Sequence, residues 1–492
     1  MLEFLKRMAN RTATENGGAA FVTTGSDCLD FFAAAGALRS AEEGDIVGRF
    51  LRAWAEDANS AMKLLFYARD VRGGLGERRV FRAILKWLAV NQPESVKKNL
   101  DYVSEFGRYD DLLTLMDTPC ENAAVALMKK QLEADLASLS ENGEVSLLAK
   151  WLPSVNASDQ RANAMGKKLT RAFGMQEAVY RKSLSALRAR IRIIENALRE
   201  KDYTFDYGAQ PSRAMFKYRR AFRCNDGERY NAFLNRVSAG EATLHADNVA
   251  PYELVQPYLT IGYGTNIRSI SAEERKTLNA TWASLTDFGG NENALTVIDT
   301  SGSMYGYDNA RPAAVALSLG IYFAERSKGL YHNHFIEFSA RPELIELKGE
   351  TFADKLCYAA SFSRIANTNL QAVFELVLRT AVTNRVRQSE MPAKLIIISD
   401  MEFDACVDNS NETVFENAKR RYEAHGYKLP QVVFWNVAAR GRRVPVSMKE
   451  QGVTLVSGVT PRLFSMVAGG AATPMQLMRD VLASERYAPI SA

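Results

Sequence analysis

One carboxylate and two hydroxyls with a strict two-residue spacing stand directly after a short apolar run. The run is Leu295–Ile298, and Asp299, Ser301 and Ser303 follow it. A tight loop can aim three such oxygens at one point. Hard oxygen ligands carrying few formal charges suit Mg²⁺, with Mn²⁺ or Ca²⁺ as substitutes, because Mg²⁺ keeps several waters in its octahedron.

Two more oxygen-bearing residues follow later in the chain. A second apolar run, Lys394–Ser399, ends at Asp400, and Thr368 precedes a predicted helix between the two runs. In doubly wound sheets, functional groups collect at the carboxyl ends of the strands. The sequence therefore predicts one metal site built from Asp299, Ser301, Ser303, Thr368 and Asp400. Helix capping by Asp299 and the two serines is the alternative, but it leaves Thr368 and Asp400 unexplained.

These five residues resemble the metal-ion-dependent adhesion site of von Willebrand factor A domains. The DxSxS motif of that site corresponds to Asp299, Ser301 and Ser303, its later threonine to Thr368 and its later aspartate to Asp400. The resemblance implies a metal with an open position that an acidic group of a partner fills. A purely structural role for the metal stays open.

The elements around this motif alternate between strands and helices. Strands are expected at Leu295–Ile298, His334–Phe338, Lys394–Ser399, Gln431–Val437 and Val453–Val456, and helices at 312–324, 351–360, 370–380, 414–424 and 474–482. Such alternation is typical of a doubly wound α/β fold with a mainly parallel sheet covered on both faces. We expect this domain to span residues 290–492.

The preceding part of the chain has a helical apolar period. Amphipathic windows recur at 51–67, 77–90, 122–139, 165–173, 180–198 and 230–237, with breakers such as Arg72-Gly73-Gly74 and Leu152-Pro153 between them. Successive helices with short connections predict an all-α helical-repeat domain over residues 28–285, without a strict sequence period. Residues 1–27 form a polar lead-in.

Several stretches of this helical part resemble the TROVE module of the Ro autoantigen family. They include Phe66-Tyr67-Ala68-Arg69-Asp70-Val71-Arg72-Gly73-Gly74, Phe106-Gly107-Arg108-Tyr109-Asp110-Asp111-Leu112 and Lys150-Trp151-Leu152-Pro153. An uncharacterised sister family of the same architecture is similar too, through Gln210-Pro211-Ser212-Arg213-Ala214-Met215 and Ser399-Asp400-Met401-Glu402-Phe403-Asp404, and is the closer match. The resemblance implies a ring of HEAT-like helical repeats closed by the von Willebrand factor A domain. Ro-like proteins bind small noncoding RNAs and the single-stranded ends of misfolded RNA.

A basic stretch from Tyr180 to Arg223 bears on the RNA question. Aromatic side chains interleave with its cations, and unpaired bases stack on aromatics while guanidinium groups contact phosphates. The candidate contacts are Arg181, Lys182, Arg188, Arg192, Arg213, Lys217 and Arg220. The alternative is a solvated basic face whose aromatics belong to the core. Charged residues are dense near the glycines of the TROVE-like stretches and include Arg69, Asp110 and Asp111. We expect these side chains to form salt bridges and helix caps and not to contact a ligand.

Composition restricts the function classes further. The net charge is +5, and the apolar runs are strand-sized, too short to span a bilayer. Five scattered cysteines (28, 120, 224, 357 and 406) favour a reducing cytoplasmic location, and the N-terminus lacks the pattern of a signal peptide. No phosphate-binding loop, zinc spacing or nucleophile elbow appears, which favours a binding protein over an enzyme.

Three functions remain in view. The first is a cytoplasmic, non-enzymatic, Ro-like RNA-binding protein that also binds Mg²⁺. The second is a protein–protein adaptor that grips an acidic partner residue through the metal site. The third is an enzyme that uses Mg²⁺ for phosphoryl chemistry, which requires a second metal or a general base such as Glu402 or Asp404.

Overall fold

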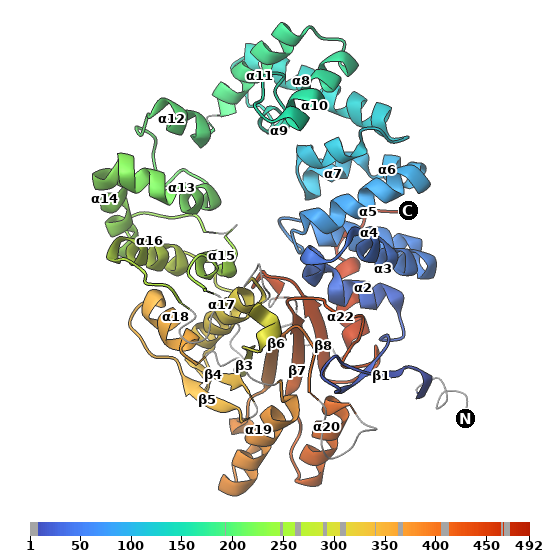
Figure 1. The fold of residues 1–492 in the computed structure, drawn as a ribbon, viewed down its shortest axis with the longest axis vertical. Helices are drawn as coiled ribbons and strands as arrows, with labels where there is room; N and C mark the ends of the chain where they lie inside the picture. The colour runs from blue at the N-terminus through green and yellow to red at the C-terminus, as the bar shows by residue number, and fades with distance from the viewer. Residues whose placement is uncertain are drawn as a thin grey trace. The chain divides into compact units, whose positions relative to one another are not determined.

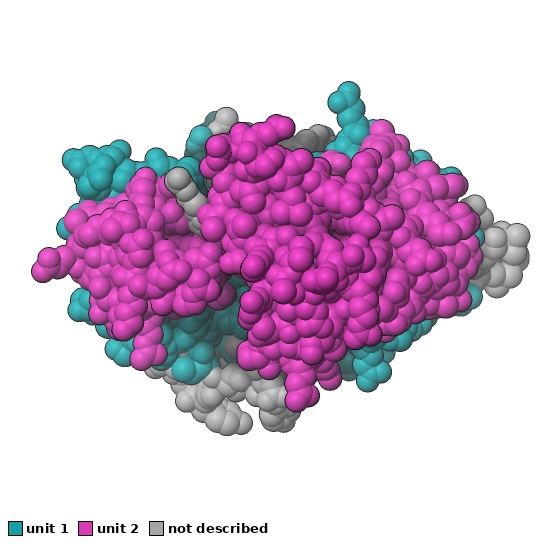
Figure 2. All heavy atoms as spheres, turned by 90° about the horizontal axis from the view of Figure 1, so that it is seen from above, with its two compact units in different colours: residues 1–64, 234–486 teal, residues 65–233, 487–492 magenta. Residues whose placement is uncertain are grey.

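The computed structural model divides the chain into two compact units, coloured separately in Figure 2. The first, here called the sheet unit, comprises Met1–Leu64 and Leu234–Arg486, and the second, the helical unit, comprises Leu65–Phe233 and Tyr487–Ala492. The structure describes residues 8–191, 193–246, 249–260, 267–288, 293–305, 311–339, 341–362, 368–404, 413–463, 466 and 473–492. Within these residues, no helix is long and apolar enough to cross a membrane.

The helical unit is built from short helices (Figure 1). They are α5 (Arg78–Asn91), α6 (Pro93–Lys98), α7 (Leu100–Phe106), η2 (Tyr109–Leu115), α8 (Glu121–Ser140), α9 (Leu148–Trp151), α10 (Gln160–Ala172), α11 (Glu177–Ile191), α12 (Ile194–Glu200) and α13 (Ser212–Asn225). Helices α4 (Ala58–Arg69) and α14 (Gly227–Ser238) each cross a boundary between the units. The apolar face predicted for 77–90 is confirmed, since Phe81, Ile84 and Leu88 of α5 are fully buried.

Two predicted helices are interrupted. The window 51–67 is divided between α3 (Glu43–Glu56) and α4, because Asp57 leaves the helical conformation and its carboxylate accepts from the amides of Asn59 and Ser60. The window 180–198 is divided between α11 and α12, where Ile193 is extended. In both places, the helical spacing of apolar residues continues across the break, but the backbone conformation of one residue ends the helix there.

The sheet unit contains a six-stranded sheet in the order β5-β4-β3-β6-β7-β8. The strands are β3 (Ala294–Asp299), β4 (His334–Phe338), β5 (Glu343–Glu346), β6 (Lys394–Ser399), β7 (Gln431–Asn436) and β8 (Val453–Ser457). All neighbours are parallel except β4 and β5. The five predicted strands and the mainly parallel sheet are confirmed. The edge strand β5 was not predicted, because only Ile345 of its residues is buried and no alternating apolar signal exists.

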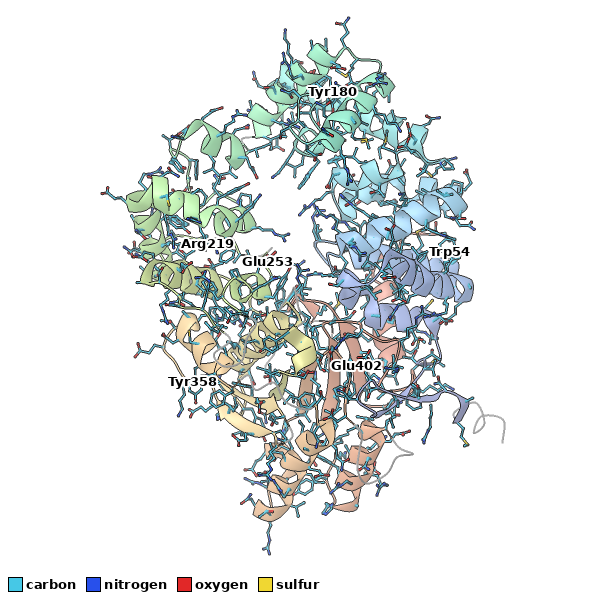
Figure 3. The ribbon with its side chains drawn as sticks, viewed as in Figure 1. Trp54, Tyr180, Arg219, Glu253, Tyr358 and Glu402 are labelled. Atoms are coloured by element: carbon cyan, nitrogen blue, oxygen red, sulfur yellow. The ribbon has the colours of Figure 1, made fainter. Side chains whose placement is uncertain are left out.

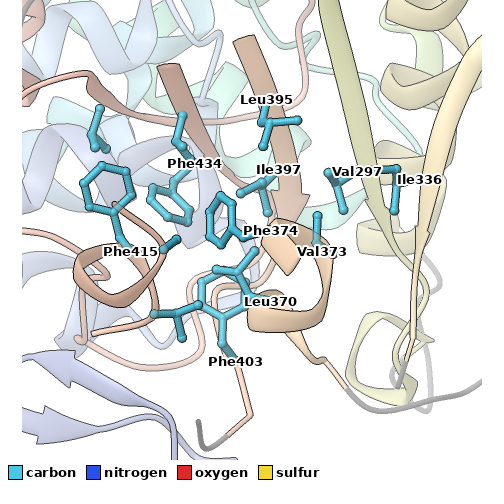
Figure 4. Packing of buried hydrophobic residues seen from close by; sticks show 14 of the residues in the cluster. Val297, Ile336, Leu370, Val373, Phe374, Leu395, Ile397, Phe403, Phe415 and Phe434 are labelled. Atoms are coloured by element: carbon cyan, nitrogen blue, oxygen red, sulfur yellow. The ribbon is translucent and has the colours of Figure 1, made fainter. Parts of the chain in front are cut away.

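Helices cover both faces of this sheet. On one face, α19 (Leu370–Asn384) and α20 (Val414–Ala424) pack Val373, Phe374 and Phe415 against alternate strand residues such as Ile397 and Phe434 (Figure 4). On the other face lies α17 (Arg311–Arg326). A Cβ on Gly320 of α17 would stand 2.2 Å from the Ile298 side chain, so this close approach requires glycine.

The remaining elements of the sheet unit flank this core. They are the hairpin of β1 (Arg11–Ala13) and β2 (Ala19–Phe21), α2 (Asp27–Ala34), η1 (Ala35–Ser40), α15 (Pro251–Val255), α16 (Ala272–Ala283), η3 (Gly302–Tyr305), α18 (Phe352–Ala360), η4 (Gln388–Glu390), α22 (Pro474–Leu482) and η5 (Glu485–Tyr487), whose last residue belongs to the helical unit. The predicted polar lead-in, residues 1–27, thus contains a hairpin where the structure describes it. The domain boundaries predicted at 28–285 and 290–492 stay predictions.

Buried ion pairs stabilise the helical unit. Arg69 and Asp111, both almost fully buried, form a pair at 2.7 Å, and Asp111 also accepts from Nε of Arg82 at 2.6 Å. A second Arg82 bond reaches Asp110 at 2.6 Å, and the backbone amide of Arg108 donates to Asp111. The prediction that these charges form salt bridges and caps is therefore confirmed.

Removing one partner of the buried pair should destabilise the helical unit strongly. Asp111→Ala removes the carboxylate that pairs with the buried Arg69 and with Arg82, so we expect a loss of about 3–5 kcal/mol. Urea denaturation followed by circular dichroism measures this change. The matched control is Glu200→Ala, which breaks an exposed pair with Arg199 and should cost under about 1 kcal/mol. Equal losses in the two variants would contradict the structural role assigned to the Arg69–Asp111 pair.

Candidate metal centre and cationic surface

The two candidate carboxylates lie at the point where the strand order of the sheet reverses. From β3 the chain passes first to β4 on one side and later to β6 on the other. Strands β3 and β6 are adjacent and parallel, with Ile298 paired to Ile398. Asp299 therefore lies beside Ser399, and Asp400 lies one residue beyond. Ligands of doubly wound sheets bind at such a switch point.

Asp299 is held from two directions. The Ser399 hydroxyl donates to Oδ2 of Asp299 at 2.5 Å, and the backbone amide of Ser301 donates to Oδ1 at 2.8 Å. Hydroxyls of Ser301 and Ser303 lie 3.0 Å apart. Asp299 and Ser301 are buried, whereas Ser303 is half-buried and Gly302 is exposed. The DxSxS loop therefore gathers three oxygen-bearing side chains, with its exposed side at Gly302.

The two oxygens of Asp400 differ in their partners. Oδ1 accepts from the backbone amide of Glu402 at 3.3 Å, while the buried Oδ2 has no hydrogen-bond partner among the residues that the structure describes. Nη1 of Arg440 lies 3.8 Å from Oδ2. A buried carboxylate oxygen without a donor is costly, so this oxygen fits a site that takes a cation.

Thr368 is buried directly before the N-cap residue of α19. Its carbonyl accepts from the amide of Asp404 at 3.0 Å. This bond ties the Thr368 segment to the loop that follows β6. The structure thus brings Asp299, Ser301 and Ser303 into one loop, places Asp400 on the neighbouring strand end, and bonds the Thr368 segment to the Asp400 loop.

Burial and mutual repulsion raise the pKa values of these carboxyls. Burial first, and then the charge of Asp400, raises the pKa of Asp299 to about 6. The pKa of Asp400 is raised by burial, against a hydrogen bond from Ser303. Glu402, also buried, has a raised pKa for the same first reason. Raised carboxyl pKa values mean that a proton or a cation is favoured at this place.

The donor set fits one hard divalent cation. Among the described residues, no three His, Cys, Asp or Glu side chains are arranged to hold a metal ion. Any ion here therefore combines the two aspartates with hydroxyl and water oxygens, which is the set that Mg²⁺ accepts. Sequence reasoning named Ser399 only as a strand end and as part of a family-like stretch, without a role at the site, and it did not name Arg440, which stands in no motif.

The predicted nucleic-acid contacts lie on helices of the helical unit. Arg181 and Lys182 on α11 are exposed, as are Arg213, Lys217 and Arg220 on α13. At i, i+4 and i+7, the last three share one face of α13, as predicted. Arg192 lies outside the described residues.

Arg188, predicted as a nucleic-acid contact, is bonded to a neighbouring segment of the helical unit. Its guanidinium donates to the carbonyls of Ala149 at 2.8 Å and Leu152 at 2.6 Å and to the hydroxyl of Ser154 at 2.7 Å. These bonds hold the loop after α9 against α11. Arg188 therefore makes a tertiary contact within the helical unit.

Most aromatics of the basic stretch are core residues. Tyr180, Tyr207, Phe216 and Phe222 are buried, and Tyr207 and Phe222 pack with Tyr230. Tyr180 and Arg219, labelled in Figure 3, mark the two helices concerned, α11 and α13. The expectation of an aromatic-rich stacking surface is thus not met by these four residues, although Tyr203 and Tyr218 are half-buried.

Positive charge gathers around Arg108. Its guanidinium lies 4.6 Å from the centre of the Trp151 ring. Burial lowers the pKa of Arg108, and the charges of Arg69, Arg213 and Arg78 lower it further, against Asp110. The α13 face that carries Arg213 is therefore within electrostatic range of cations from the α5–η2 region.

Comparisons with known proteins agree with a chain of two parts. A domain of unknown function, DUF7788, matches residues 293–479. The uncharacterized protein L728 of Acanthamoeba polyphaga mimivirus is 29% identical over 517 residues, which cover 96% of this chain and 88% of that protein. A solved structure, the RO (RSR) protein of Deinococcus radiodurans, is similar with a TM-score of 0.42 and 16% identity, covering 90% of this chain and 93% of that one. Another domain of unknown function, DUF2828, matches residues 14–126 and 121–288. Because these matches span more than half of the 492 residues, the chain belongs to the DUF2828 family.

Proposed function

We propose that the chain is a non-enzymatic RNA-binding protein whose sheet unit is a von Willebrand factor A-type domain holding one Mg²⁺. Support for the metal comes from Asp400 Oδ2, a buried carboxylate oxygen to which none of the described residues donates a hydrogen bond, beside Asp299 at the switch point of the sheet. Asp299 and Asp400, with the hydroxyls of Ser301, Ser303 and Thr368, would hold the ion. The bound ion would neutralise the two buried carboxylates.

Support for RNA comes from the concentration of cations in the helical unit. Arg78 and Arg213 lower the pKa of Arg108 because their charges repel it, and such repulsion is relieved when a polyanion binds. The exposed ridge Arg213, Lys217 and Arg220 offers three phosphate contacts on one helix. The HEAT-like repeat, the ring and the cytoplasmic location expected from sequence stay predictions.

A protein adaptor is the alternative. It would use the metal site to grip an acidic residue of a partner, and it would leave the cationic ridge without a ligand. RNA that copurifies with the protein and disappears on nuclease treatment supports the first function. Protein free of RNA, with one defined protein partner, supports the adaptor.

The first test concerns the metal. In protein stripped of metal with EDTA, Asp299→Asn should raise the unfolding free energy at pH 8 by roughly 1–3 kcal/mol, because a neutral amide replaces a buried charge. A carboxyl whose folded pKa exceeds its unfolded pKa binds protons more tightly when folded. Metal-free stability should therefore fall as pH rises from 3.8 to about 6 in the native protein, and less so in the variant.

With Mg²⁺ bound, the native protein should become more stable than the Asp299→Asn variant. At about 100 times its Kd, Mg²⁺ should stabilise the native protein by about 2–3 kcal/mol and the Asn variant hardly at all. Thermal unfolding with Mg²⁺, Mn²⁺ or Ca²⁺ provides the measurement, and Glu343→Gln, an exposed carboxylate on β5, provides the control. A native protein that none of the three ions stabilises would refute the metal site.

The second test concerns RNA. Replacing Arg213, Lys217 and Arg220 with Ala should weaken RNA binding and flatten its salt dependence by about one unit of slope per lost phosphate contact. Fluorescence anisotropy with an RNA hairpin carrying a 3′ single-stranded tail, across a KCl series, measures both effects. A blunt duplex should bind more weakly than the tailed hairpin.

The control variant removes the same number of positive charges from the sheet unit. Arg379, Lys428 and Arg479 are exposed cations of the sheet unit, and their triple Ala variant should retain the native salt slope. Identical slopes for the native protein and the α13 variant would exclude the ridge as an RNA contact and favour the adaptor.

A further inference from the structure

A cavity lies in the sheet unit between α2, α3 and the carboxyl ends of β7 and β8, four elements that are labelled in Figure 1. Its apolar part is formed by buried side chains, among them Phe31, Phe434 and Leu455. Charged residues of α2, α3 and the segment 441–445 complete the lining. Within the described residues, the lining includes none of the five candidate metal ligands, so the cavity is a separate place in the fold.

The volume of the cavity restricts its occupant to a small molecule. The space open to the centre of a water molecule is about 40 Å³, and one water takes up roughly 10–15 Å³ on this measure. About three waters, or a ligand of about four non-hydrogen atoms, therefore fit inside. The cavity has room for a small ion but not for a nucleotide.

Arg49 of α3 is the most deeply buried cation of the lining, with 7% of its surface exposed. Its Nε donates to Oδ2 of Asp45 at 2.8 Å, and its Nη2 donates to the Gly441 carbonyl at 2.9 Å. These two bonds fix the plane of the guanidinium group. Among the described residues, nothing accepts a hydrogen bond from its Nη1, although a guanidinium carries five N–H donors. A buried guanidinium that lines a cavity with donors to spare is suited to bind an anion.

Further cations line the same cavity. Nη2 of Arg442 donates to Oδ1 of Asp45 at 2.8 Å, so one carboxylate holds both Arg442 and Arg49. Arg52 pairs with Asp27 at 3.1 Å. The charges of Arg442 and Arg52 lower the pKa of Arg49, after the larger effect of burial and against the attraction of Asp45. An anion placed among these guanidinium groups would relieve their repulsion.

Two aspartates limit the charge of that anion. Asp27 and Asp30 of α2 also line the cavity, where Asp27 accepts from Arg52 and Oδ1 of Asp30 accepts from the amide of Thr24 at 2.8 Å. Their negative charges disfavour a dianion such as hydrogen phosphate. The apolar part of the lining favours a ligand that carries an alkyl group. A carboxylate with a short alkyl chain meets both conditions, and its two oxygens match the fork of a guanidinium group.

We infer that this cavity binds a small aliphatic monocarboxylate of the size of acetate or propionate. The carboxylate accepts from Nη1 of Arg49, and the alkyl group contacts the apolar side chains of the lining. This binding site goes beyond the proposed metal and RNA functions and depends on neither. An acidic side chain of another protein carries the same chemical group, so the two sources of carboxylate are tested separately.

Titration calorimetry with sodium propionate on the full chain, at constant ionic strength, tests the assignment. The native protein should bind propionate, and sodium phosphate should not compete with it. Arg49→Gln should weaken propionate binding about 10- to 100-fold, because a hydrogen bond to a charged group is lost. The control Arg379→Gln removes an exposed cation of α19 and should bind propionate like the native protein. Equal affinities of the native protein and Arg49→Gln, or displacement of propionate by phosphate, would overturn the assignment.

A second variant keeps every charge and changes only the space. Ala34 lines the cavity and is buried, so Ala34→Leu should occupy part of the volume and abolish propionate binding, while the circular dichroism spectrum stays native. Native affinity for propionate in Ala34→Leu would show that the ligand binds elsewhere and would refute the site.

A blocked aspartyl compound, N-acetylaspartic acid amide, distinguishes the two sources of carboxylate. It should not compete with propionate, because its backbone amides exceed the volume of the cavity. Competition at an affinity equal to that of propionate would assign the cavity to an acidic side chain of a partner protein, and the small-molecule assignment would fail.

Discussion

The repulsion between Asp299 and Asp400 is the constraint around which the sheet unit is arranged. Because β3 and β6 are adjacent and parallel, two aspartates at their carboxyl ends must lie close together in a buried place. Burial penalises each charge and proximity penalises the pair. The hydroxyl of Ser399, the amides of Ser301 and Glu402, and the distant Arg440 each offset part of that penalty. Arg440 approaches Oδ2 of Asp400 to 3.8 Å, beyond hydrogen-bonding distance, and the remaining deficit is what a divalent cation would correct.

In the helical unit, a buried carboxylate is compensated by cationic side chains of the protein itself. Asp111 is as deeply buried as Asp299, yet Arg69 and Arg82 contact both of its oxygens. Its charge is therefore satisfied by protein atoms alone, which is typical of a structural site. Arg108 shows a different balance, since the charges of Arg69, Arg213 and Arg78 lower its pKa and the charge of Asp110 raises it. We therefore assign a structural role to the paired charge of Asp111, and we expect ligands at Asp400 and near Arg108, where the charges are less well compensated.

Strand positions followed from sequence because the strands are short apolar runs that end at polar residues. Thus β4 and β6 were predicted with their observed bounds, and β3 and β7 to within one residue. Breaks such as the one at Asp57 escaped prediction, because a side chain that caps a new helix leaves the apolar period intact. The role of Arg188 escaped too, since sequence shows its charge but not the turn of carbonyls at 149–152 that it binds. The contact of residues 14–18 with residues 402–404 has no local signal, because the two loops are far apart in the sequence and their meeting depends on the whole sheet unit.

The division of the chain into two units determines when each unit can finish folding during synthesis. The sheet unit is assembled from Met1–Leu64 and Leu234–Arg486, with most of the helical unit inserted between them. The helical unit in turn includes Tyr487–Ala492, whose Tyr487 hydroxyl donates to Asp70 at 3.0 Å and whose Ser491 carbonyl accepts from Asn99. The sheet unit can therefore complete its contacts only after residues 234–486 have been synthesised, and the helical unit only after Tyr487–Ala492 have followed. The hairpin of β1 and β2, whose tip bonds to Glu402 and Phe403, has no partner loop while the residues between them are being synthesised, and chaperones have that interval in which to bind it.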